Sequence, residues 1–450
     1  MMPKYVHEIR DPLHIFIRMD SDERKVLDSR PFQRLRYIHQ LALTYLVYPG
    51  ATHRRFEHSL GVMDLASRIY DVVIDPSNLR KDVLELLPEL SREDARSYWR
   101  RALRMAALSH DLGHLPFSHA AEKELLPEGW SHERITVEII RSEEMKAIWD
   151  EMTPPLRTED IIKLAVGQKK LPEFEKNASF TIWEAILAEI ITGDAFGADR
   201  MDYLLRDSHH TGVAYGRFDH YRLIDSLRIL PQRVEEEDLF EPVLGIDEGG
   251  IHSAEALLLA RYFMFTQLYL HPVRRIYDIH LKDFIRSWLG EGYLPTDVEG
   301  LLQLTDNEIT AELARVSREA KHPGHESAKR IINHKHFKLL YKRNPEDASR
   351  NPDASKAIFE AACEKFGEPS VRYDSYNEND KKDRAPPSFP VQKSDDRISW
   401  SRAESDVIER IPPIWLGYVF ISPERIKDAV KWRDANLGKI IELKEEEDNP

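Results

Sequence analysis

The spacing of apolar residues along the chain predicts a protein built mainly from helices. In residues 51–75 the apolar side chains recur every three or four positions, as on the buried face of an amphipathic helix. These side chains are Leu60, Met63, Leu65, Ile69 and Val73. Near-helical spacing also occurs in residues 30–46, and residues 180–191 are apolar nearly all round, which indicates a buried helix. Further helices are predicted at residues 20–28, 135–148, 158–166, 198–207 and 423–432.

A long aromatic-rich segment, residues 253–288, is also predicted to be helical, but interrupted or bent at Pro272, because proline cannot continue the hydrogen-bond pattern of a helix. Alternating apolar and polar side chains in residues 6–19 predict two short strands around a turn at Asp11-Pro12. The run IWLGYVFI, residues 414–421, predicts another strand.

Composition adds an outline of domains and setting. The 450 residues are 42% hydrophobic, enough to bury a large core, and we expect a helical domain over residues 1–295 and an α+β lobe over residues 296–450. Residues 368–396 are polar and highly charged, and they predict a long surface loop or a disordered insert. The single cysteine, Cys363, excludes a disulfide framework and fits a reducing compartment.

The N-terminal residues, the length of the apolar runs and the net charge bear on whether the protein associates with membranes or nucleic acids. The N-terminal residues carry no apolar signal segment, and no run approaches the ~18 apolar residues of a membrane span. We therefore expect a cytoplasmic protein with no membrane association. The net charge of −14 gives no strong signal for nucleic-acid binding.

The densest cluster of titratable side chains lies in residues 108–133, which contain four histidines within 23 residues and carboxylates between them. His110 and Asp111 stand near the end of an apolar, helix-forming run and can bring an imidazole and a carboxylate to one metal ion. Gly113 and Pro116 end the helix, so the following loop can fold back over the ion. A helix end with solvated histidines is the alternative, and it suits a lone histidine better than four.

The order His58, His110-Asp111, Asp199 is similar to the H…HD…D pattern of the HD phosphohydrolase superfamily. Longer motifs resemble the deoxynucleoside triphosphate triphosphohydrolases, which include sterile-alpha-motif and HD-domain dNTPases and bacterial dGTPase-like relatives. These motifs are FQRLRYIHQL, YPGATHRRFEHSLGV, HDLGHLPFSH and ADRMDYLLRDSHHTGV. The resemblance implies a mainly α fold: a helical HD domain with a small N-terminal β-hairpin and a C-terminal α+β lobe. It also implies hydrolysis of a dNTP to deoxynucleoside and triphosphate by a homo-oligomer, a dimer or tetramer.

The resemblance further implies that His58, His110, Asp111 and Asp199 bind one divalent metal ion in each active site. Two imidazoles and two carboxylates suit Mn, Fe, Zn, Ni or Co and also admit Mg. The family's catalytic positions match His114, His119, Glu122 and His132. Imidazoles titrate near neutrality, so they can donate a proton to the leaving oxygen. Glu122 stands where the family usually has Asp.

Substrate contacts are implied at eight further positions. These are Gln40, Leu41, Arg55, Arg200, Tyr203, Asp207, Arg261 and Tyr269. The three arginines would bind the polyphosphate through charge-assisted hydrogen bonds. Asp207 would hold the 3′-hydroxyl, while Tyr203 and Tyr269 would crowd the 2′ position and so reject ribose.

Asp28, Gln33 and Arg36 match the residues that read guanine in a regulatory nucleotide site of the family. The alternative is that they only brace the helix that begins the FQRLRY motif. At the neighbouring phosphate-binding positions Gln267 replaces an arginine and Pro272 a lysine, which removes two cations. We therefore expect a homo-oligomer that either needs no activator or responds to a guanine nucleotide alone.

Two other functions stay open from the sequence. An HD phosphohydrolase can act on another nucleotide, a monophosphate or a signalling nucleotide. A non-catalytic nucleotide-sensing protein can keep the same pocket, although the complete set of ligands, arginines and histidines counts against it. Release of triphosphate from a panel of substrates separates the three functions.

Overall fold

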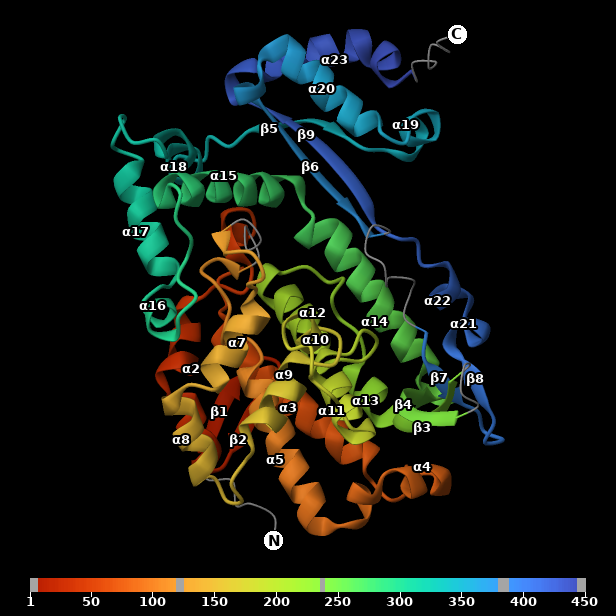
Figure 1. Ribbon diagram of the computed structural model, residues 1–450. Coiled ribbons are helices and arrows are strands. Elements are labelled where there is room, and N and C mark those ends of the chain that lie inside the picture. Colours follow the sequence, from red (N-terminus) through yellow and green to blue (C-terminus); the bar gives the residue numbers. More distant parts are fainter. Residues whose placement is uncertain (1–6, 119–124, 235–238, 379–387, 443–450) are drawn as a thin grey trace. The chain divides into compact units, whose positions relative to one another are not determined.

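The computed structural model describes residues 7–118, 125–234, 239–378 and 388–442 (Figure 1). The chain forms two compact units, each assembled from separate segments. The first unit comprises residues 1–264, 291–309 and 386–411, and the second comprises residues 265–290, 310–385 and 412–450. The mainly α fold expected from the sequence is confirmed. None of the described helices is both long and apolar enough to cross a bilayer.

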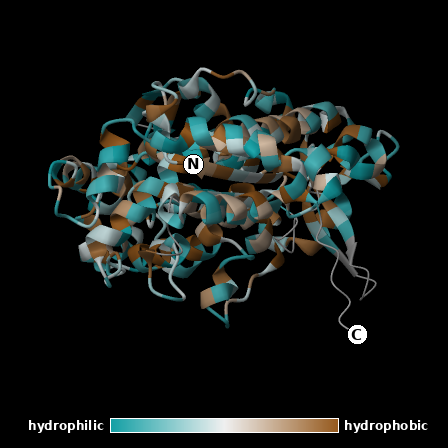
Figure 2. Ribbon diagram, turned by 90° about the horizontal axis from the view of Figure 1, so that it is seen from above, coloured by the Kyte–Doolittle hydropathy of each residue, from teal (hydrophilic) through white to brown (hydrophobic). Residues whose placement is uncertain are grey.

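Five helices form the centre of the first unit. They are α3 (Arg55–Val73), α5 (Glu93–Ser109), α9 (Thr158–Val166), α11 (Ile182–Thr192) and α12 (Ala198–Thr211). Helix α3 packs against both α5 and α12, and α9 packs against both α5 and α11. The apolar side chains that give α3 its helical period are almost completely buried. Figure 2 shows hydrophobic and hydrophilic residues alternating along single ribbons.

The N-terminal hairpin is confirmed. Strands β1 (His7–Asp11) and β2 (Ile15–Met19) pair antiparallel with Asp11 opposite Ile15. Helix α1 (Ser21–Asp28) follows, and its first turn is fixed by a capping box in which Asp20 and Glu23 exchange side-chain to backbone hydrogen bonds.

The near-helical spacing over residues 30–46 does not give one helix. Helix α2 (Arg30–Arg34) runs into a single 3-10 turn, η1 (Leu35–Tyr37), and a second 3-10 helix, η2 (Ala42–Leu46), follows a break. In the break, Arg55 donates its backbone N–H to the carbonyl of Ile38, and Gln40 donates to the carbonyl of His53. Because these backbone groups pair with the chain that leads into α3, they are not available to a continuous helix.

The remaining helices of the first unit follow the sequence prediction with small shifts. Residues 135–148, expected as one helix, are divided between α7 (His132–Ile140) and α8 (Glu143–Glu151), because Ser142 caps a new helix. Helix α14 (Ile251–Met264) begins the predicted aromatic-rich segment. The shorter helices are α4 (Lys81–Leu86), α10 (Leu171–Phe174), α13 (His220–Ser226), α16 (Val298–Leu302), α21 (Ser401–Glu404) and α22 (Asp406–Arg410).

The first unit also has a sheet in the strand order β3-β4-β7-β8. The strands are β3 (Leu227–Val234), β4 (Leu239–Asp247), β7 (Pro390–Gln392) and β8 (Ile398–Trp400). Strand β7 lies within residues 368–396, which the sequence predicted as a loop or disordered insert. The same prediction is wrong for β6 (Val371–Asn377) of the second unit. Both strands pair through backbone hydrogen bonds, which need no run of apolar side chains.

The second unit contains the α+β lobe. Its antiparallel sheet has the order β5-β9-β6, with β5 (Lys338–Lys342) and β9 (Trp415–Ile421). Helices α20 (Ala354–Phe366) and α23 (Ile426–Ile441) cover one face, where Val419 and Ile421 of β9 are buried. The alternate residues Tyr418 and Phe420 pack with Ile276 on the other face, as the two-residue period of a strand requires.

The other helices of this unit begin with the five-residue π-helix Phe265–Tyr269, and α15 (Pro272–Leu289) follows it. The helical segment is interrupted at Leu270 and His271, directly before Pro272, which is one of the two outcomes that the sequence predicted. Helices α18 (His325–Ile332) and α19 (Pro345–Arg350) come later in the chain. Helix α17 (Asp306–Val316) begins in the first unit and ends in the second.

Candidate active site

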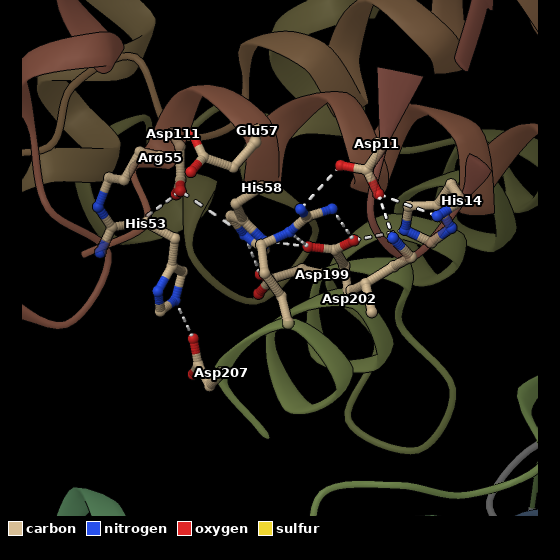
Figure 3. Close-up of polar contacts among 12 residues, drawn as sticks. Asp11, His14, His53, Arg55, Glu57, His58, Asp111, Asp199, Asp202 and Asp207 are labelled. Atoms are coloured by element: carbon tan, nitrogen blue, oxygen red, sulfur yellow. Dashed lines mark hydrogen bonds and ion pairs between the residues drawn. The ribbon is translucent and has the colours of Figure 1, made fainter. Parts of the chain in front are cut away.

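Three helices of the first unit bring the predicted metal ligands together (Figure 3). His58 lies in the first turn of α3, His110 caps the C-terminal end of α5, and Asp199 lies in the first turn of α12. One ligand atom from each of these residues lies within 4.8 Å of the other two. The geometry therefore gathers His58, His110 and Asp199 into one group that can hold a metal ion.

The carboxylate of Asp111 lies next to this group and also pairs with Arg55. Its Oδ1 lies 3.4 Å from Nε2 of His110, and its Oδ2 lies 3.7 Å from Nε2 of His58. Oδ2 also accepts a 2.5 Å hydrogen bond from Nη1 of Arg55. Burial opposes the charge of Asp111, but Arg55, His110 and His114 hold the pKa of its carboxyl well below its usual range.

Both imidazoles turn Nε2 toward the common point and anchor Nδ1 elsewhere. His110 donates from Nδ1 to the carbonyl of Ala107 at 2.7 Å, which leaves Nε2 as the bare acceptor. This Nε2 is buried and makes no hydrogen bond to any residue that the structure describes. The Nδ1 of His58 is anchored by Asp202 at 2.8 Å. Metal-ligating histidines are held in this way, so the residues present fit a divalent ion.

The neighbouring carboxylates favour the protonated form of the His58 imidazole. Burial lowers its pKa, but hydrogen bonds to Asp199 and Asp202 outweigh burial and raise the pKa to about 10. Binding of a cation to Nε2 competes with this proton.

A buried network of ion pairs holds the side chain of His58, one of the three residues that can bind the metal ion, on its Nδ1 side. Asp202 is 0% exposed and accepts from Nε and Nη2 of Arg206 at 2.7 and 2.9 Å. It also contacts Nε2 of His14 at 2.7 Å, while Arg206 donates to Asp11 at 2.9 Å. Asp11 and His14 come from the N-terminal hairpin, so the hairpin helps to orient His58 through Asp202.

The predicted catalytic histidines His114 and His132 stack on each other. Their ring centroids are 4.1 Å apart with 19° between the planes, and Nε2 of His114 lies 3.1 Å from Oδ1 of Asp111. Burial, Arg55 and His132 hold the pKa of His114 well below its usual range. His119 and Glu122, the other two predicted catalytic residues, lie outside the described residues.

Two predicted sugar-binding positions are linked through a histidine. The backbone N–H of Gln40 donates to the carbonyl of His53 at 3.1 Å, and Leu41, beside Gln40, is buried. Nε2 of His53 in turn contacts Oδ1 of Asp207 at 2.7 Å. The loop before α3 and the middle of α12 thus meet at His53.

The predicted phosphate-binding residues have different surroundings. Arg55 is buried against Asp111, as described above. The charges of Arg200, Arg261 and Asp199 all act on the Tyr203 hydroxyl: burial and Asp199 raise its pKa, and the two arginines lower it. Tyr269 belongs to the second unit, where its carbonyl accepts a hydrogen bond from Arg274.

The three predicted guanine-reading residues all make contacts of their own. Gln33 donates to the carbonyl of Leu27 at 2.7 Å and accepts from Nε of Arg36 at 2.9 Å. The Arg36 guanidinium lies 3.5 Å from the centroid of the Phe56 ring, and Asp28 accepts from Arg24. These contacts orient the three side chains, and their role as guanine-reading residues stays a prediction.

The sequence prediction missed the buried network of Asp11, His14, Asp202 and Arg206. Asp202 and Arg206 are four residues apart on α12, a spacing at which opposite charges meet on a helix, and this was the only signal available. Nothing local in the sequence marks Asp11 and His14, because their partners are almost two hundred residues away.

Comparison with known proteins gives the family. Residues 55–206 match the HD domain, and residues 218–363 match the HD associated region. A hypothetical protein from Aquifex aeolicus is 32% identical, with a TM-score of 0.73 over 94% of this chain and 99% of that one. The chain belongs to the HD-domain phosphohydrolase superfamily. A phosphohydrolase from Bacteroides thetaiotaomicron, 24% identical with a TM-score of 0.67, covers 92% of this chain and 99% of its own and shares the fold.

Among curated relatives, an uncharacterized protein of Methanocaldococcus jannaschii is 37% identical over 305 residues, 68% of this chain and 54% of the relative. Deoxynucleoside triphosphate triphosphohydrolase SAMHD1 of Homo sapiens is 31% identical over 333 residues, 66% of this chain and 49% of the relative. The chain thus spans about half the length of the curated relatives it matches.

Proposed function

We propose that the protein hydrolyses deoxynucleoside triphosphates to deoxynucleoside and triphosphate with the help of a divalent metal ion held by His58, His110, Asp111 and Asp199. The observation that carries this proposal is the group of two inward-turned imidazole Nε2 atoms and adjoining carboxylates, with a guanidinium on one carboxylate. Resemblance to the deoxynucleoside triphosphate triphosphohydrolases supports the choice of substrate.

In such a reaction the metal ion, the two histidines and Arg55 have different roles. A divalent ion, when bound, lowers the pKa of a water ligand and polarises a phosphate oxygen. His58 and His110 offer Nε2, while Asp202 and the carbonyl of Ala107 fix their ring orientation. Arg55 lies against Asp111, so its guanidinium is next to any phosphate oxygen bound at the ligand group.

The remaining residues bind and orient the nucleotide. Arg200 and Arg261, whose charges both act on the Tyr203 hydroxyl, supply cations for the rest of the polyphosphate. Asp207, oriented by His53, accepts from the 3′-hydroxyl. Proton donation to the leaving oxygen is assigned to His119, Glu122 and His132 of the matching motif, because the lowered pKa of His114 disfavours a proton on that imidazole.

A panel of nucleotides tests the proposed function. Canonical dNTPs, NTPs, deoxynucleoside monophosphates and cyclic nucleotides are incubated with Mn, Fe, Co, Ni, Zn or Mg, and the phosphate product is identified. We expect triphosphate and deoxynucleoside from dNTPs and little product from NTPs. Orthophosphate from a monophosphate would instead establish another HD phosphohydrolase activity, and binding without any product would establish a nucleotide sensor.

Arg261→Ala is expected to lower kcat/KM for dNTPs by at least roughly tenfold. A charge-assisted hydrogen bond to phosphate contributes about 1.5–3 kcal/mol, and the lower value already corresponds to that factor. Arg92→Ala is the matched control, since Arg92 is 70% exposed and pairs with Asp94 at the start of α5. Unchanged kinetics of Arg261→Ala on every dNTP would show that Arg261 serves the structure instead.

Hydrolysis of dATP is expected either without an activator or with GTP alone, by a homo-oligomer. The expectation rests on Asp28, Gln33 and Arg36 as guanine contacts and on the missing cations at Gln267 and Pro272. Light scattering gives the mass while hydrolysis is followed with and without GTP. A strictly monomeric enzyme, or one silent until both GTP and a second dNTP are present, contradicts it.

A further inference from the structure

A buried carboxylate, Asp306, joins two loops beside the ligand group. Asp306 is the first residue of α17 and is 1% exposed. Its Oδ2 accepts from the backbone N–H of His39 at 2.7 Å and from Nδ1 of the same histidine at 2.5 Å. Its Oδ1 accepts from the backbone N–H of Phe117 at 2.7 Å. We call these three residues the Asp306 clasp.

One of the two loops is the turn of residues 112–118, which directly follows the His110-Asp111 pair. Phe117 and Ser118 both have φ of 57°, in the left-handed region that non-glycine residues rarely adopt. Such a backbone persists only where its surroundings fix it. The bond from Phe117 to Asp306 and a 2.9 Å bond from the N–H of Ser118 to the carbonyl of Leu115 supply that constraint.

The other end of the clasp leads to the metal ligands. The Ser118 hydroxyl donates to the carbonyl of His39 at 3.0 Å and accepts from Nε of Arg55 at 2.9 Å. Arg55 then reaches Asp111 through Nη1. Hydrogen bonds through His39, Ser118 and Arg55 therefore connect Asp306 with Asp111, and Ser118 of the turn stands in the middle of this path.

Arg34 ties the same segments a second time. It is almost completely buried and donates from Nε to the carbonyl of Leu304 at 2.9 Å and from Nη1 to the carbonyl of His114 at 2.9 Å. Thr305 is fixed as well, since its N–H donates to Glu308 at 2.7 Å. Residues 304–306 are thus held rigidly enough to act as a support for the turn.

We propose that Asp306 is a positioning residue for hydrolysis, one that holds the turn of residues 112–118 and thereby keeps the Arg55 guanidinium on Asp111; its catalytic consequence rests on the proposed function. Asp306 lies outside residues 55–206, which match the HD domain, and within the HD associated region. The associated region therefore supplies a part that the ligand group of the HD domain needs.

Asp306→Ala tests the clasp. The ligands His58 and His110 are anchored through Asp202 and Ala107 and not through the clasp, so metal content is expected to stay at the wild-type level. The kcat for dNTPs is expected to fall between about tenfold and a hundredfold, the cost of displacing a catalytic group by roughly 1 Å. Asp306→Asn keeps one oxygen acceptor for Phe117 and should recover part of the loss.

The Arg55→Ala background separates positioning from general stability. If Asp306 acts through Arg55, Asp306→Ala has no further effect on kcat once Arg55 is absent. Additive losses would overturn the proposal, as would loss of metal from Asp306→Ala or an unchanged kcat. Ser118→Ala cuts the same path without touching Asp306 and should give the same fall in kcat, which keeps the test decisive if Asp306→Ala does not fold.

Asp347→Ala is the matched control. Asp347 is another buried acid in the first turn of a helix, α19, and it accepts from the Tyr341 hydroxyl at 2.8 Å and from Asn344 at 2.6 Å. We expect its loss to leave kcat unchanged. Amide exchange of residues 112–118 provides a readout without substrate: it should be faster in Asp306→Ala and unchanged in Asp347→Ala. Should the wild type hydrolyse no nucleotide, the proposed function fails, and the exchange rates still decide on the clasp.

Discussion

Alanine at position 111 is expected to abolish both turnover and binding of the metal ion. The substitution removes a proposed charged ligand whose carboxylate lies within 4 Å of the imidazoles of His58 and His110. It also removes the partner of Arg55, and a buried cation without its partner typically costs about 3–5 kcal/mol. Elemental analysis of the purified protein and triphosphate release from dNTPs measure the two effects.

Asp111→Asn separates charge from shape in this experiment. It keeps the volume and one oxygen but loses the negative charge, so it should bind metal weakly and hydrolyse little. If Asp111→Ala retained full metal occupancy, Asp111 would not be a ligand. The group of His58, His110 and Asp199 would then be the complete set.

Asp202→Ala is expected to be the most destabilising single substitution near the site. It leaves Arg206, which is 0% exposed, with only Asp11 as a carboxylate partner, and breaking such a buried pair costs about 3–5 kcal/mol in the free energy of unfolding. Nδ1 of His58 loses its anchor at the same time, which should weaken metal binding about 10–100-fold. Urea unfolding and metal titration measure the two effects separately.

The same control variant, Asp347→Ala, distinguishes the two consequences of losing Asp202. It also removes a buried carboxylate, but in the second unit and far along the chain from any ligand. Its stability should fall while its metal affinity stays at the wild-type value. Wild-type metal affinity in Asp202→Ala would contradict the anchoring of His58.

The sequence predicted elements whose side-chain period matches their burial. The hairpin β1–β2 is of this kind, and so is helix α3, whose periodic apolar residues are buried together with most of its other side chains. The prediction of one continuous helix over residues 30–46 was wrong. The apolar side chains there are buried at near-helical spacing, but the backbone groups of Ile38 and Gln40 pair with the segment that leads into α3. Strand β6 was missed because most of its side chains are only partly buried, so no alternation is visible.

For the site, the order of His58, His110-Asp111 and Asp199 was readable because metal ligands are restricted to a few residue types. Asp202 and Asp306 were not readable. Nothing in the identity of a buried aspartate distinguishes it from one on the surface, and what matters here is a partner far away in the chain: His14 for Asp202 and Phe117 for Asp306. Such partners are known only once the fold has brought them together.

Closure of the N-terminal hairpin is expected to be coupled to metal binding at His58, although the hairpin is far from the ligands in the sequence. Asp11 holds Arg206 and His14 contacts Asp202, so the closed hairpin favours the ring orientation of His58 that accepts a cation. Linkage makes this effect reciprocal: an ion on His58 must favour the closed hairpin by the same free energy. Chelation should therefore speed amide exchange in residues 7–19. Opening the hairpin should in turn raise the dissociation rate of the ion, although none of its residues is a ligand.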